Sequence, residues 1–330
     1  KKNMNNEIHI VCATDSNYIP YCGVLLTSIF ENNKEENVYV HILGTALSVE
    51  NKMALYRVKD RYNQEVIFYD IDDVIAHNES LKQWNEVNKT ASWSIATFYR
   101  LFVADVLPTT LNQVLYLDID TIVCGSLKEL WVEGLGGRAI GWVIDGKPEP
   151  NMKRLHLTNY FNAGVLLINL DFWRKHQIQK RCMDYLALHW QDLQYVDQDV
   201  INPILQEYDY KELHPKYNVI SYFFLCDSYY KRFIPQKYWE VGREAMSNPI
   251  IIHYISSVKP WHKDCDHPLK NEWLKYLRQT EWRDLKMTNK RTVLLRLRLL
   301  IKECVKDIAR LIPSIREAHP NPKNRWYSGL

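Results

Sequence analysis

The stretch VLYLDIDTIV (114–123) is an apolar run interrupted by Asp118 and Asp120. In an extended segment, residues two apart face the same side, so both carboxylates are expected to project together while Ile119 points into the core. Two like charges this close raise each other's pKa unless a cation lies between them. A divalent metal that also binds a diphosphate is the simplest remedy. The alternative is a strand end that carries two solvated aspartates.

Short β-rich runs alternate along the chain with amphipathic stretches of helical length. The runs that predict strands are 8–15, 38–43, 66–71, 114–120, 139–145, 163–170 and 249–255. The stretches that predict helices are 21–32, 48–61 and 170–189, the last capped by Asn169 or Asp171. This alternation predicts an α/β fold with a mostly parallel central sheet flanked by helices. Ligands of such sheets collect at the carboxyl ends of strands, where Asp15, Asp120 and Asp145 stand.

The composition is that of a globular protein. With 330 residues, 46% of them hydrophobic and 25% charged, the chain fits one large domain or one domain with an appendage, which excludes disordered, collagen and coiled-coil classes. A run of 18 uncharged apolar residues is lacking, and so is an apolar segment with a cleavage site near the beginning, so neither a membrane span nor a secretory signal is expected. Seven scattered cysteines, without a CxxC pair, favour free thiols in a reducing cytoplasm.

A histidine and a lysine follow another apolar run. In HYISSVKPWH (253–262), His253 stands at a predicted strand end and Lys259 comes six residues later. A histidine added to two carboxylates makes a mixed nitrogen and oxygen site, which suits Mn²⁺ better than Mg²⁺. Lys259 would neutralise a phosphate as a point charge. Taken alone, His253 is better explained as a core histidine whose hydrogen bonds are satisfied.

Two further segments carry polar groups at the ends of predicted elements. In YFNAGVLLINLDFW (160–173), Asn162 precedes a strand whose Ala163-Gly164 pair permits close backbone approach to a ligand. In YVDQDVINPIL (195–205), the acidic DQD triplet (197–199) opens a predicted helix, where an acidic residue is often only a cap. Both segments are therefore candidates for ligand contact.

Six aromatic residues gather in SYFFLCDSYYKRF (221–233). Aromatic rings commonly pack in cores, and a buried strand with a flanking loop explains this cluster. The alternative is that the cluster lines a ligand site.

Six blocks of the sequence, in this order and at these separations, resemble glycosyltransferase family 8, and within it the bacterial lipopolysaccharide α-galactosyl- and α-glucosyltransferases. The resemblance runs from about Ile8 to Trp273 and implies a GT-A fold, in which one nucleotide-binding α/β domain uses a UDP-sugar donor and Mn²⁺. The blocks are ATDSNY (13–18), FYRLFVADVLP (98–108), VLYLDIDTIV (114–123), YFNAGVLLINLDFW (160–173), DQD (197–199) and HYISSVKPWH (253–262).

The resemblance also implies roles for individual residues. Tyr18 would stack on the uracil base, Arg100 would reach the donor sugar and Lys259 would hold the diphosphate. Asp145 and Asn162 would hold sugar hydroxyls. The metal ligands would be Asp118, Asp120 and His253. The donor-binding residues would be Ala13, Thr14, Asp15, Asn17, Tyr18, Arg100, Asp118, Ile119, Asp120, Asn162, Ala163 and Lys259.

The reaction implied is transfer of galactose or glucose from a UDP-sugar to a saccharide acceptor, such as a lipopolysaccharide or cell-surface glycan precursor, with retention at the anomeric carbon. The catalytic residues would be Gln198, Asp197 and Asp145. Double displacement needs a nucleophile on the opposite face of the sugar. The matching residue is Gln198, a poor nucleophile, which favours front-face departure and attack. Mn²⁺ and Lys259 would stabilise the charge on the leaving UDP.

The C-terminal stretch differs from the rest in charge. From Lys286 onward it holds 11 Lys or Arg against 3 Asp or Glu. Residues 1–270 are expected to form the catalytic domain and residues 271–330 a basic helical region. Residues 290–312 read as an amphipathic helix, which either lies on an anionic membrane or docks on the domain. The resemblance favours peripheral contact with the inner face of the cytoplasmic membrane; nucleic acid is not an expected partner.

Two other classes of protein stay open from the residues. DIDT (118–121) also fits the DxDxT motif of haloacid-dehalogenase-type phosphohydrolases, with Asp118 as nucleophile and Asp120 as general acid, although that motif normally opens its domain. A non-catalytic nucleotide-sugar binding protein on the same fold is the third class. Metal-dependent UDP binding separates the phosphohydrolase from the other two.

Overall fold

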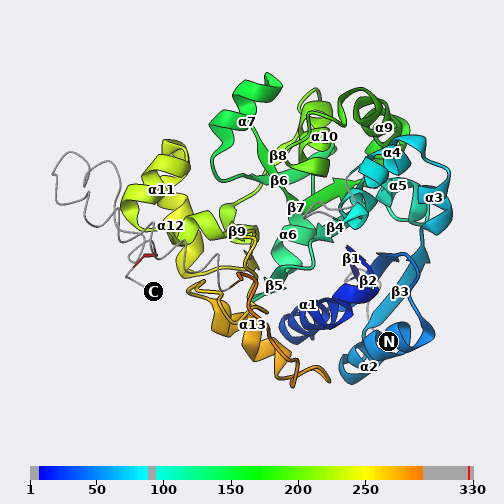
Figure 1. The fold of residues 1–330 in the computed structure, drawn as a ribbon, viewed down its shortest axis with the longest axis vertical. Coiled ribbons are helices and arrows are strands. Elements are labelled where there is room, and N and C mark those ends of the chain that lie inside the picture. Colours follow the sequence, from blue (N-terminus) through cyan, green and yellow to red (C-terminus); the bar gives the residue numbers. More distant parts are fainter. Residues whose placement is uncertain (1–6, 88–93, 293–325, 328–330) are drawn as a thin grey trace.

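The computed structural model describes residues 7–87, 94–292 and 326–327. The predicted α/β architecture is confirmed (Figure 1). Its main sheet has seven strands, which lie in the order β3 (Glu65–Asp70), β2 (Asn37–Gly44), β1 (Glu7–Thr14), β4 (Gln113–Leu117), β7 (Phe161–Asn169), β6 (Ile140–Ile144) and β8 (Lys211–Glu212).

The main sheet is mostly parallel, as predicted. β7 runs antiparallel to both of its neighbours, β4 and β6, and the other pairings are parallel. The amino end of β7 therefore lies at the same sheet edge as the carboxyl ends of β1, β4 and β6. This edge gathers residues from four strands that are distant in sequence.

A small second sheet adjoins the turn after β4. It consists of β5 (Thr121–Val123), β10 (Ile251–His253) and β9 (Val219–Ile220), with β10 in the centre. β10 pairs antiparallel with β5, so that His253 is the register partner of Thr121. This pairing places the histidine next to the two aspartates that precede Thr121.

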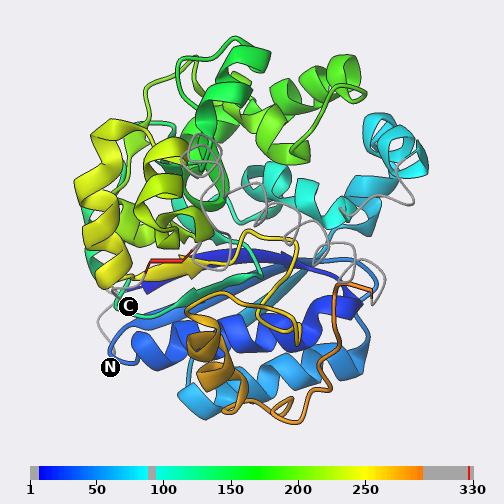
Figure 2. The ribbon, with the colours of Figure 1, turned by 60° about the vertical axis from the view of Figure 1, so that its left-hand side comes forward.

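Helices cover both faces of the main sheet (Figure 2). One face is covered by α1 (Ile19–Asn32), α2 (Val49–Tyr62) and α13 (Lys270–Leu277), which pack on one another through α1. The other face is covered by η3 (Ile95–Phe102), α5 (Val103–Val106), α8 (Leu170–Lys175), α9 (Ile178–His189) and α10 (Val196–Leu205). The remaining helical elements are η2 (Ser16–Tyr18), α3 (Asp72–Ala76), α4 (Glu79–Val87), α6 (Lys128–Glu133), α7 (Pro148–Leu155), η4 (Pro215–Tyr217), η5 (Ser221–Phe224), α11 (Asp227–Phe233), η6 (Gln236–Tyr238) and α12 (Trp239–Ser247).

The two-residue period of β1 explains why the sheet is buried on both faces. Ile10 and Cys12 pack into the core beneath α1, whereas Val11 and Ala13 pack into the core beneath η3. A strand buried on both faces has a continuous apolar sequence, which is the pattern of residues 10–13. Rigid support on both faces fixes the position of the polar residues that follow the strand.

Two predicted elements differ from the observed ones. The helix expected over 170–189 is two helices, because the chain turns at Gln177, whose φ is 51°. Asn169 rather than Asp171 caps the first of them, accepting a hydrogen bond from the Phe172 N–H at 2.9 Å. The strand expected over 114–120 ends at Leu117, and Asp118 to Asp120 form a turn.

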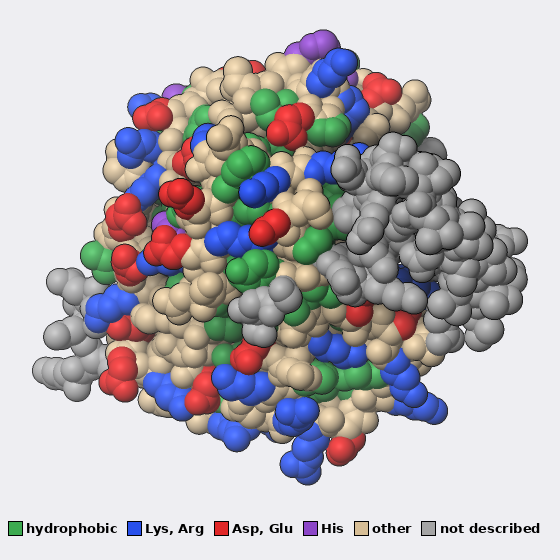
Figure 3. Space-filling view, turned by 90° about the vertical axis from the view of Figure 1, so that its left-hand side faces the viewer, with side chains coloured by type: hydrophobic (Ala, Val, Ile, Leu, Met, Phe, Trp, Pro, Cys, Tyr) green, Lys and Arg blue, Asp and Glu red, His purple; other side chains and the backbone are tan. Residues whose placement is uncertain are grey.

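Figure 3 views the molecule from the left-hand side of Figure 1, and basic and acidic side chains are intermixed over the described part of this face. Among the described residues, no helix is both long and apolar enough to cross a bilayer. Cys12, Cys22 and Cys182 are buried free thiols, as expected. The predicted amphipathic helix over 290–312 falls outside the described residues from position 293 onward.

Candidate active site

Polar residues from four strands meet at one edge of the main sheet. Asp15 follows β1, Asp118 follows β4 and Asp145 follows β6, while Asn162 stands near the amino end of the antiparallel β7. In open α/β sheets, ligands bind in the crevice outside the carboxyl ends of the strands. The topology thus brings together residues that lie more than 100 positions apart.

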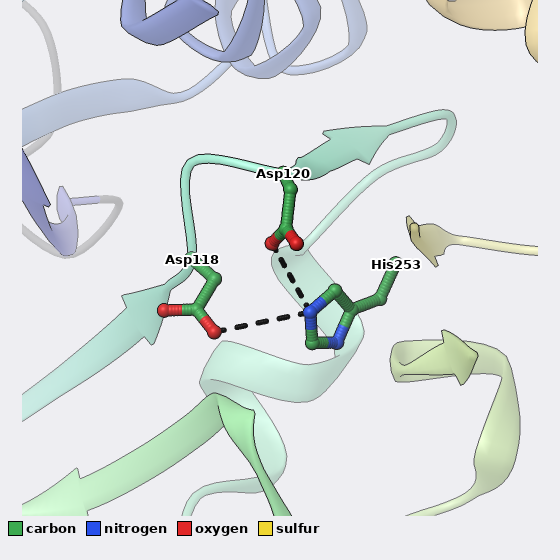
Figure 4. A group of neighbouring side chains, drawn as sticks. All are labelled: Asp118, Asp120 and His253. Carbon is green, nitrogen blue, oxygen red and sulfur yellow. Dashed lines mark ion pairs between the residues drawn. The ribbon is translucent and has the colours of Figure 1, made fainter. Parts of the chain in front are cut away.

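The two aspartates of the Asp-x-Asp motif face His253, although they do so from a turn and not from an extended strand (Figure 4). The Asp118 N–H donates to the Gly164 carbonyl at 2.8 Å, and the Thr121 N–H donates back to the Asp118 carbonyl at 3.1 Å. The Nε2 of His253 lies 3.1 Å from a carboxylate oxygen of Asp120 and 3.8 Å from one of Asp118.

Asp118, Asp120 and His253 fit a divalent cation. One ligand atom from each lies within 4.8 Å of the others, and the three groups offer the mixed oxygen and nitrogen donors that suit Mn²⁺. Lys259 hydrogen-bonds the second carboxylate oxygen of Asp120. Burial alone would raise the pKa of Asp120, but Lys259 and His253 hold it well below its usual range. Asp120 therefore stays ionised and able to bind a cation.

The absence of a side chain at Gly164 leaves room for His253 and Asp118. A Cβ atom at that position would lie 2.1 Å from the Cε1 of His253 and 2.7 Å from a carboxylate oxygen of Asp118. Such contacts are impossible for carbon atoms, so a side chain here would displace the histidine ring. The close approach expected of Ala163-Gly164 is thus made to His253 and Asp118.

Arg100 connects the metal-ligand cluster to α10. Its guanidinium is buried, donates to Asp118 at 2.7 Å, lies 2.9 Å from Asp197 and also donates to the Ala163 carbonyl. Its Cζ sits 4.5 Å from the centre of the Tyr116 ring. Burial opposes the charge, but Asp118 and Asp197 raise the pKa of Arg100 and keep it cationic.

Asp145, Asn162 and Gln198 form a buried hydrogen-bonded group. The Asn162 Nδ2 and the Gln198 Nε2 each donate to Asp145, at 3.1 and 3.3 Å. The Gln198 Oε1 accepts from the Ala163 N–H at 2.9 Å. Burial raises the pKa of Asp145 to about 6, although the hydrogen bonds from Asn162 and Gln198 oppose the rise. The carboxylate and the glutamine amide are held in one arrangement.

The first turn of α10 carries the DQD triplet, and its members have different environments. Asp197 accepts from the Thr97 hydroxyl and pairs with Arg100, while burial raises its pKa to about 6. Asp199 is fully buried and accepts from the hydroxyl of Tyr160, the guanidinium of Arg154 and two backbone N–H groups. Asp199 is therefore structural.

The backbone that introduces the triplet is strained. Val196 has φ of 46°, a conformation that β-branched residues rarely adopt and that costs about 1–3 kcal/mol. The hydrogen bonds and ion pairs of Asp197 and Asp199 offset this conformational free energy. Asp197 and Gln198, which follow Val196 in the first turn of α10, contact Arg100 and Asp145.

Two adjoining cavities open at this edge and share residues of the cluster. The larger has a volume of about 350 Å³ and the smaller about 200 Å³. Both are lined by Thr97, Arg100, Asp118, Asp120 and Lys259. The larger also contains Asp145, Asn162, Ala163, Asp197, Gln198 and His253, and the smaller contains Ala13, Thr14, Asp15, Tyr18 and Ile119.

Asn17 is the one predicted donor-binding residue outside both linings. Its backbone N–H donates to a carboxylate oxygen of Asp15 at 2.8 Å and so fixes that side chain. The Tyr18 ring is partly exposed and packs edge-on against Tyr21 and Trp261. Tyr18 therefore borders the smaller cavity with an open face.

Several lining residues were not expected from the sequence. They include Thr97, Tyr116, Tyr195 and Trp326. The aromatic cluster 221–233 contributes in part: Tyr222 and Leu225 line the larger cavity, whereas Phe223, Phe224 and Tyr230 are buried. The cluster is helical, so the buried strand predicted for it is wrong.

The comparisons with known proteins agree with this geometry. Residues 9–265 match the family model described as "Glycosyl transferase family 8". The chain is 25% identical to general stress protein A of Bacillus subtilis, over 83% of this chain and 94% of that protein. It is 30% identical to a lipopolysaccharide 1,2-glucosyltransferase of Escherichia coli, over 82% and 78%.

A solved structure of the galactosyltransferase LgtC with donor and acceptor sugar analogues has the same fold. The TM-score is 0.70 at 26% identity, and the match covers 84% of this chain and 99% of that chain. The GT-A fold implied by the resemblance is thereby confirmed. The chain belongs to glycosyltransferase family 8, a family of retaining hexosyltransferases.

Proposed function

We propose that this enzyme transfers galactose or glucose from UDP to a saccharide acceptor and that Asp118, Asp120 and His253 hold a Mn²⁺ ion. The observation that carries the proposal is the convergence of these three side chains at the boundary between two cavities. A nucleotide-sugar has two unlike ends joined by a diphosphate. Two cavities that share Asp118 and Asp120, with His253 lining the larger one, match that division.

The smaller cavity would receive the nucleoside. Its lining offers the exposed face of Tyr18 for the uracil base and the carboxylate of Asp15 as a hydrogen-bond acceptor. The shared residues Asp120 and Lys259 lie where the diphosphate would then pass. Lys259 pairs with Asp120 and donates to the Tyr254 carbonyl, so a contact with phosphate would require its ammonium group to turn.

The larger cavity would receive the hexose. Asp145 and Asn162 offer acceptor and donor groups to sugar hydroxyls, and Gln198 lies beside them. A bound Mn²⁺ would stabilise the negative charge of the departing UDP as a Lewis acid. Lys259 would add a positive charge near the same oxygens.

Gln198 suits stabilisation of an oxocarbenium-like sugar better than nucleophilic attack. An amide oxygen is a weak nucleophile, and this one already accepts from the Ala163 N–H. The neighbouring Asp197 is engaged by Arg100 and Thr97, so its carboxylate is not available as a free nucleophile. Both features favour departure and attack on the same face of the sugar, which retains the anomeric configuration.

The acceptor would enter beside the hexose. The lining of the larger cavity also includes the apolar or aromatic side chains of Tyr222, Leu225, Ile255 and Trp326. Sugar rings pack their apolar faces on such side chains. Because the relatives include lipopolysaccharide glycosyltransferases, we propose a lipid-linked saccharide as acceptor, with residues 290–312 in contact with the inner face of the cytoplasmic membrane.

The phosphohydrolase alternative gives no role to His253 or Lys259. Metal-dependent binding of UDP distinguishes it from the proposed function. Calorimetric titration of the full chain with UDP, with and without Mn²⁺, is the direct test. The proposal expects tight binding of UDP in the presence of Mn²⁺ and weak binding after the metal is removed with a chelator. Absence of UDP binding under both conditions would overturn it. Turnover of UDP-galactose against UDP-glucose then identifies the donor.

A further inference from the structure

Asn218 joins the metal-ligand cluster to the sugar side of the site. It is fully buried and follows the short helix η4. Its Oδ1 lies 3.1 Å from the Nδ1 of His253, and its Nδ2 donates to the Oδ1 of Asn162 at 2.9 Å. One amide thus touches both a candidate metal ligand and a residue that lines the hexose cavity.

The direction of these hydrogen bonds is fixed at the Asn162 end. The Gly164 N–H can only donate, and it donates to the Asn162 Oδ1 at 3.0 Å. The Asn162 Nδ2 in turn donates to the Asp145 carboxylate, which only accepts when ionised. Both anchors make the Oδ1 of Asn162 the acceptor. The side-chain amide of Asn218 must therefore direct its Nδ2 toward the Oδ1 of Asn162.

The same reasoning passes through Asn218 to the histidine. Because its Nδ2 faces Asn162, its Oδ1 faces His253 and acts as an acceptor. The Nδ1 of His253 must then carry a hydrogen. In the neutral ring the lone pair is left on Nε2, the atom that points at Asp118 and Asp120.

We propose that Asn218 is a positioning residue that fixes the tautomer and the ring orientation of His253 and thereby sets the affinity of the site for Mn²⁺. This inference rests on the metal site of the proposed function. A ligating histidine whose other nitrogen is hydrogen-bonded is held in the binding tautomer, and loss of such a partner weakens metal binding by about 10- to 100-fold.

The local fold holds Asn218 in place without help from a ligand. Its N–H donates to the Pro215 carbonyl at 2.9 Å, and its own carbonyl accepts from the Ile220 N–H at 3.0 Å. Ile220 in β9 is the parallel register partner of His253 in β10. The side chain of Asn218, directly before β9, is therefore held next to that of His253 in the paired strand β10.

Two substitutions separate the two contacts of Asn218. Asn218→Ala removes both, and its affinity for Mn²⁺, measured by electron paramagnetic resonance of the free ion, should fall by about 10- to 100-fold. Asn218→Asp keeps an acceptor for the Nδ1 hydrogen but loses the donor to Asn162. It should retain Mn²⁺ affinity within roughly threefold of the wild type while donor turnover falls.

Asn202→Ala is the matched control. Asn202 is also fully buried and makes hydrogen bonds to the backbone of Phe161 and Gln198, but none of them reaches His253. Its Mn²⁺ affinity should equal that of the wild type. If Asn202→Ala weakens Mn²⁺ binding as much as Asn218→Ala, or if Asn218→Asp does so while folded, the effect comes from packing and the inference fails.

A measurement on the unsubstituted protein avoids dependence on folding of the variants. In protein labelled with ¹⁵N-histidine and free of metal, nuclear magnetic resonance on the basic side of the ring's titration should show His253 as the Nδ1–H tautomer. The Nε2–H tautomer would overturn the inference. Failure of the wild type to bind Mn²⁺ would instead overturn the proposed function, because the tautomer would still report on Asn218.

Discussion

The Nε of Arg100 lies 2.9 Å from a carboxylate oxygen of Asp197, while the same guanidinium donates to Asp118 at 2.7 Å. One buried cation therefore holds together the turn after β4 and the first turn of α10. These two elements carry Asp118, Asp120 and Gln198. Arg100 is therefore one of the contacts that fix the position of Gln198 relative to Asp118.

Replacement of Arg100 should lower the stability of the folded protein. Arg100→Met leaves two carboxylates near each other without their shared cation, and breaking a buried ion pair by removing one partner costs about 3–5 kcal/mol. The free energy of unfolding, measured by urea denaturation, should fall by that amount. The control is Arg57→Met, which removes an exposed pair with Glu281 and should cost about 1 kcal/mol or less. Equal losses in the two variants would contradict the role of Arg100.

Gly164→Ala should weaken metal binding with little change in the rest of the fold. The added methyl group would collide with the His253 ring and with Asp118, so the ring must shift away from the metal-ligand position. We expect Mn²⁺ affinity to fall by about 10- to 100-fold. In the control Gly44→Ala, the new methyl group meets the flexible end of Leu47, and affinity should be unchanged. Wild-type affinity in Gly164→Ala would refute the packing argument.

Gln198→Ala should separate turnover from binding. If Gln198 acts on the sugar only in the transition state, its loss should lower the rate of transfer by about 10²- to 10³-fold while UDP affinity changes little. Steady-state turnover and calorimetric UDP binding measure the two quantities. Parallel losses in both would show that the residue supports the donor site and not the reaction.

Asp145→Asn should make the protein more stable in a way that depends on pH. The folded-state pKa of Asp145 is about 6, above its ordinary value of 3.8, because burial disfavours the charge. The ionised group therefore destabilises the fold above pH 6, by about 3 kcal/mol at most, and the penalty disappears as the pH falls toward 4.

Thermal unfolding of both proteins between pH 5 and pH 8 tests this prediction. The Tm of Asp145→Asn should exceed that of the wild type at pH 8, and the difference should narrow toward pH 5. Transfer activity should fall in the variant, because the carboxylate is proposed to hold a sugar hydroxyl. A Tm difference that is constant with pH would contradict the predicted burial penalty.

The sequence predicted the strands and the meeting of Asp118, Asp120 and His253 because both follow from local patterns. Apolar runs predict buried strands, and polar residues directly after such runs gather at one sheet edge. The Asp-x-Asp turn was mistaken for a strand continuation, since the alternation of Asp118, Ile119 and Asp120 is the same in both.

The residues that position the candidate site could not be predicted from the sequence. Asn218 stands in HPKYN, an ordinary turn, and its contact with His253 arises only from the pairing of β9 with β10. From the sequence, Gly164 is only a glycine within a strand. The need for glycine there follows from the position of His253 in the structure. Asp197 and Asp199 look equivalent in DQD, and only their different partners separate a cavity residue from a structural one.

The release of UDP from UDP-galactose and from UDP-glucose, with and without Mn²⁺, tests the central claim most directly. Slow donor hydrolysis needs no acceptor, so the assay compares wild type with Asp120→Asn without a choice of acceptor. We predict release from one of the two donors that depends on Mn²⁺ and falls by about 100-fold or more in Asp120→Asn. Release that is independent of Mn²⁺, or equal in the two proteins, would contradict a catalytic metal at Asp118, Asp120 and His253.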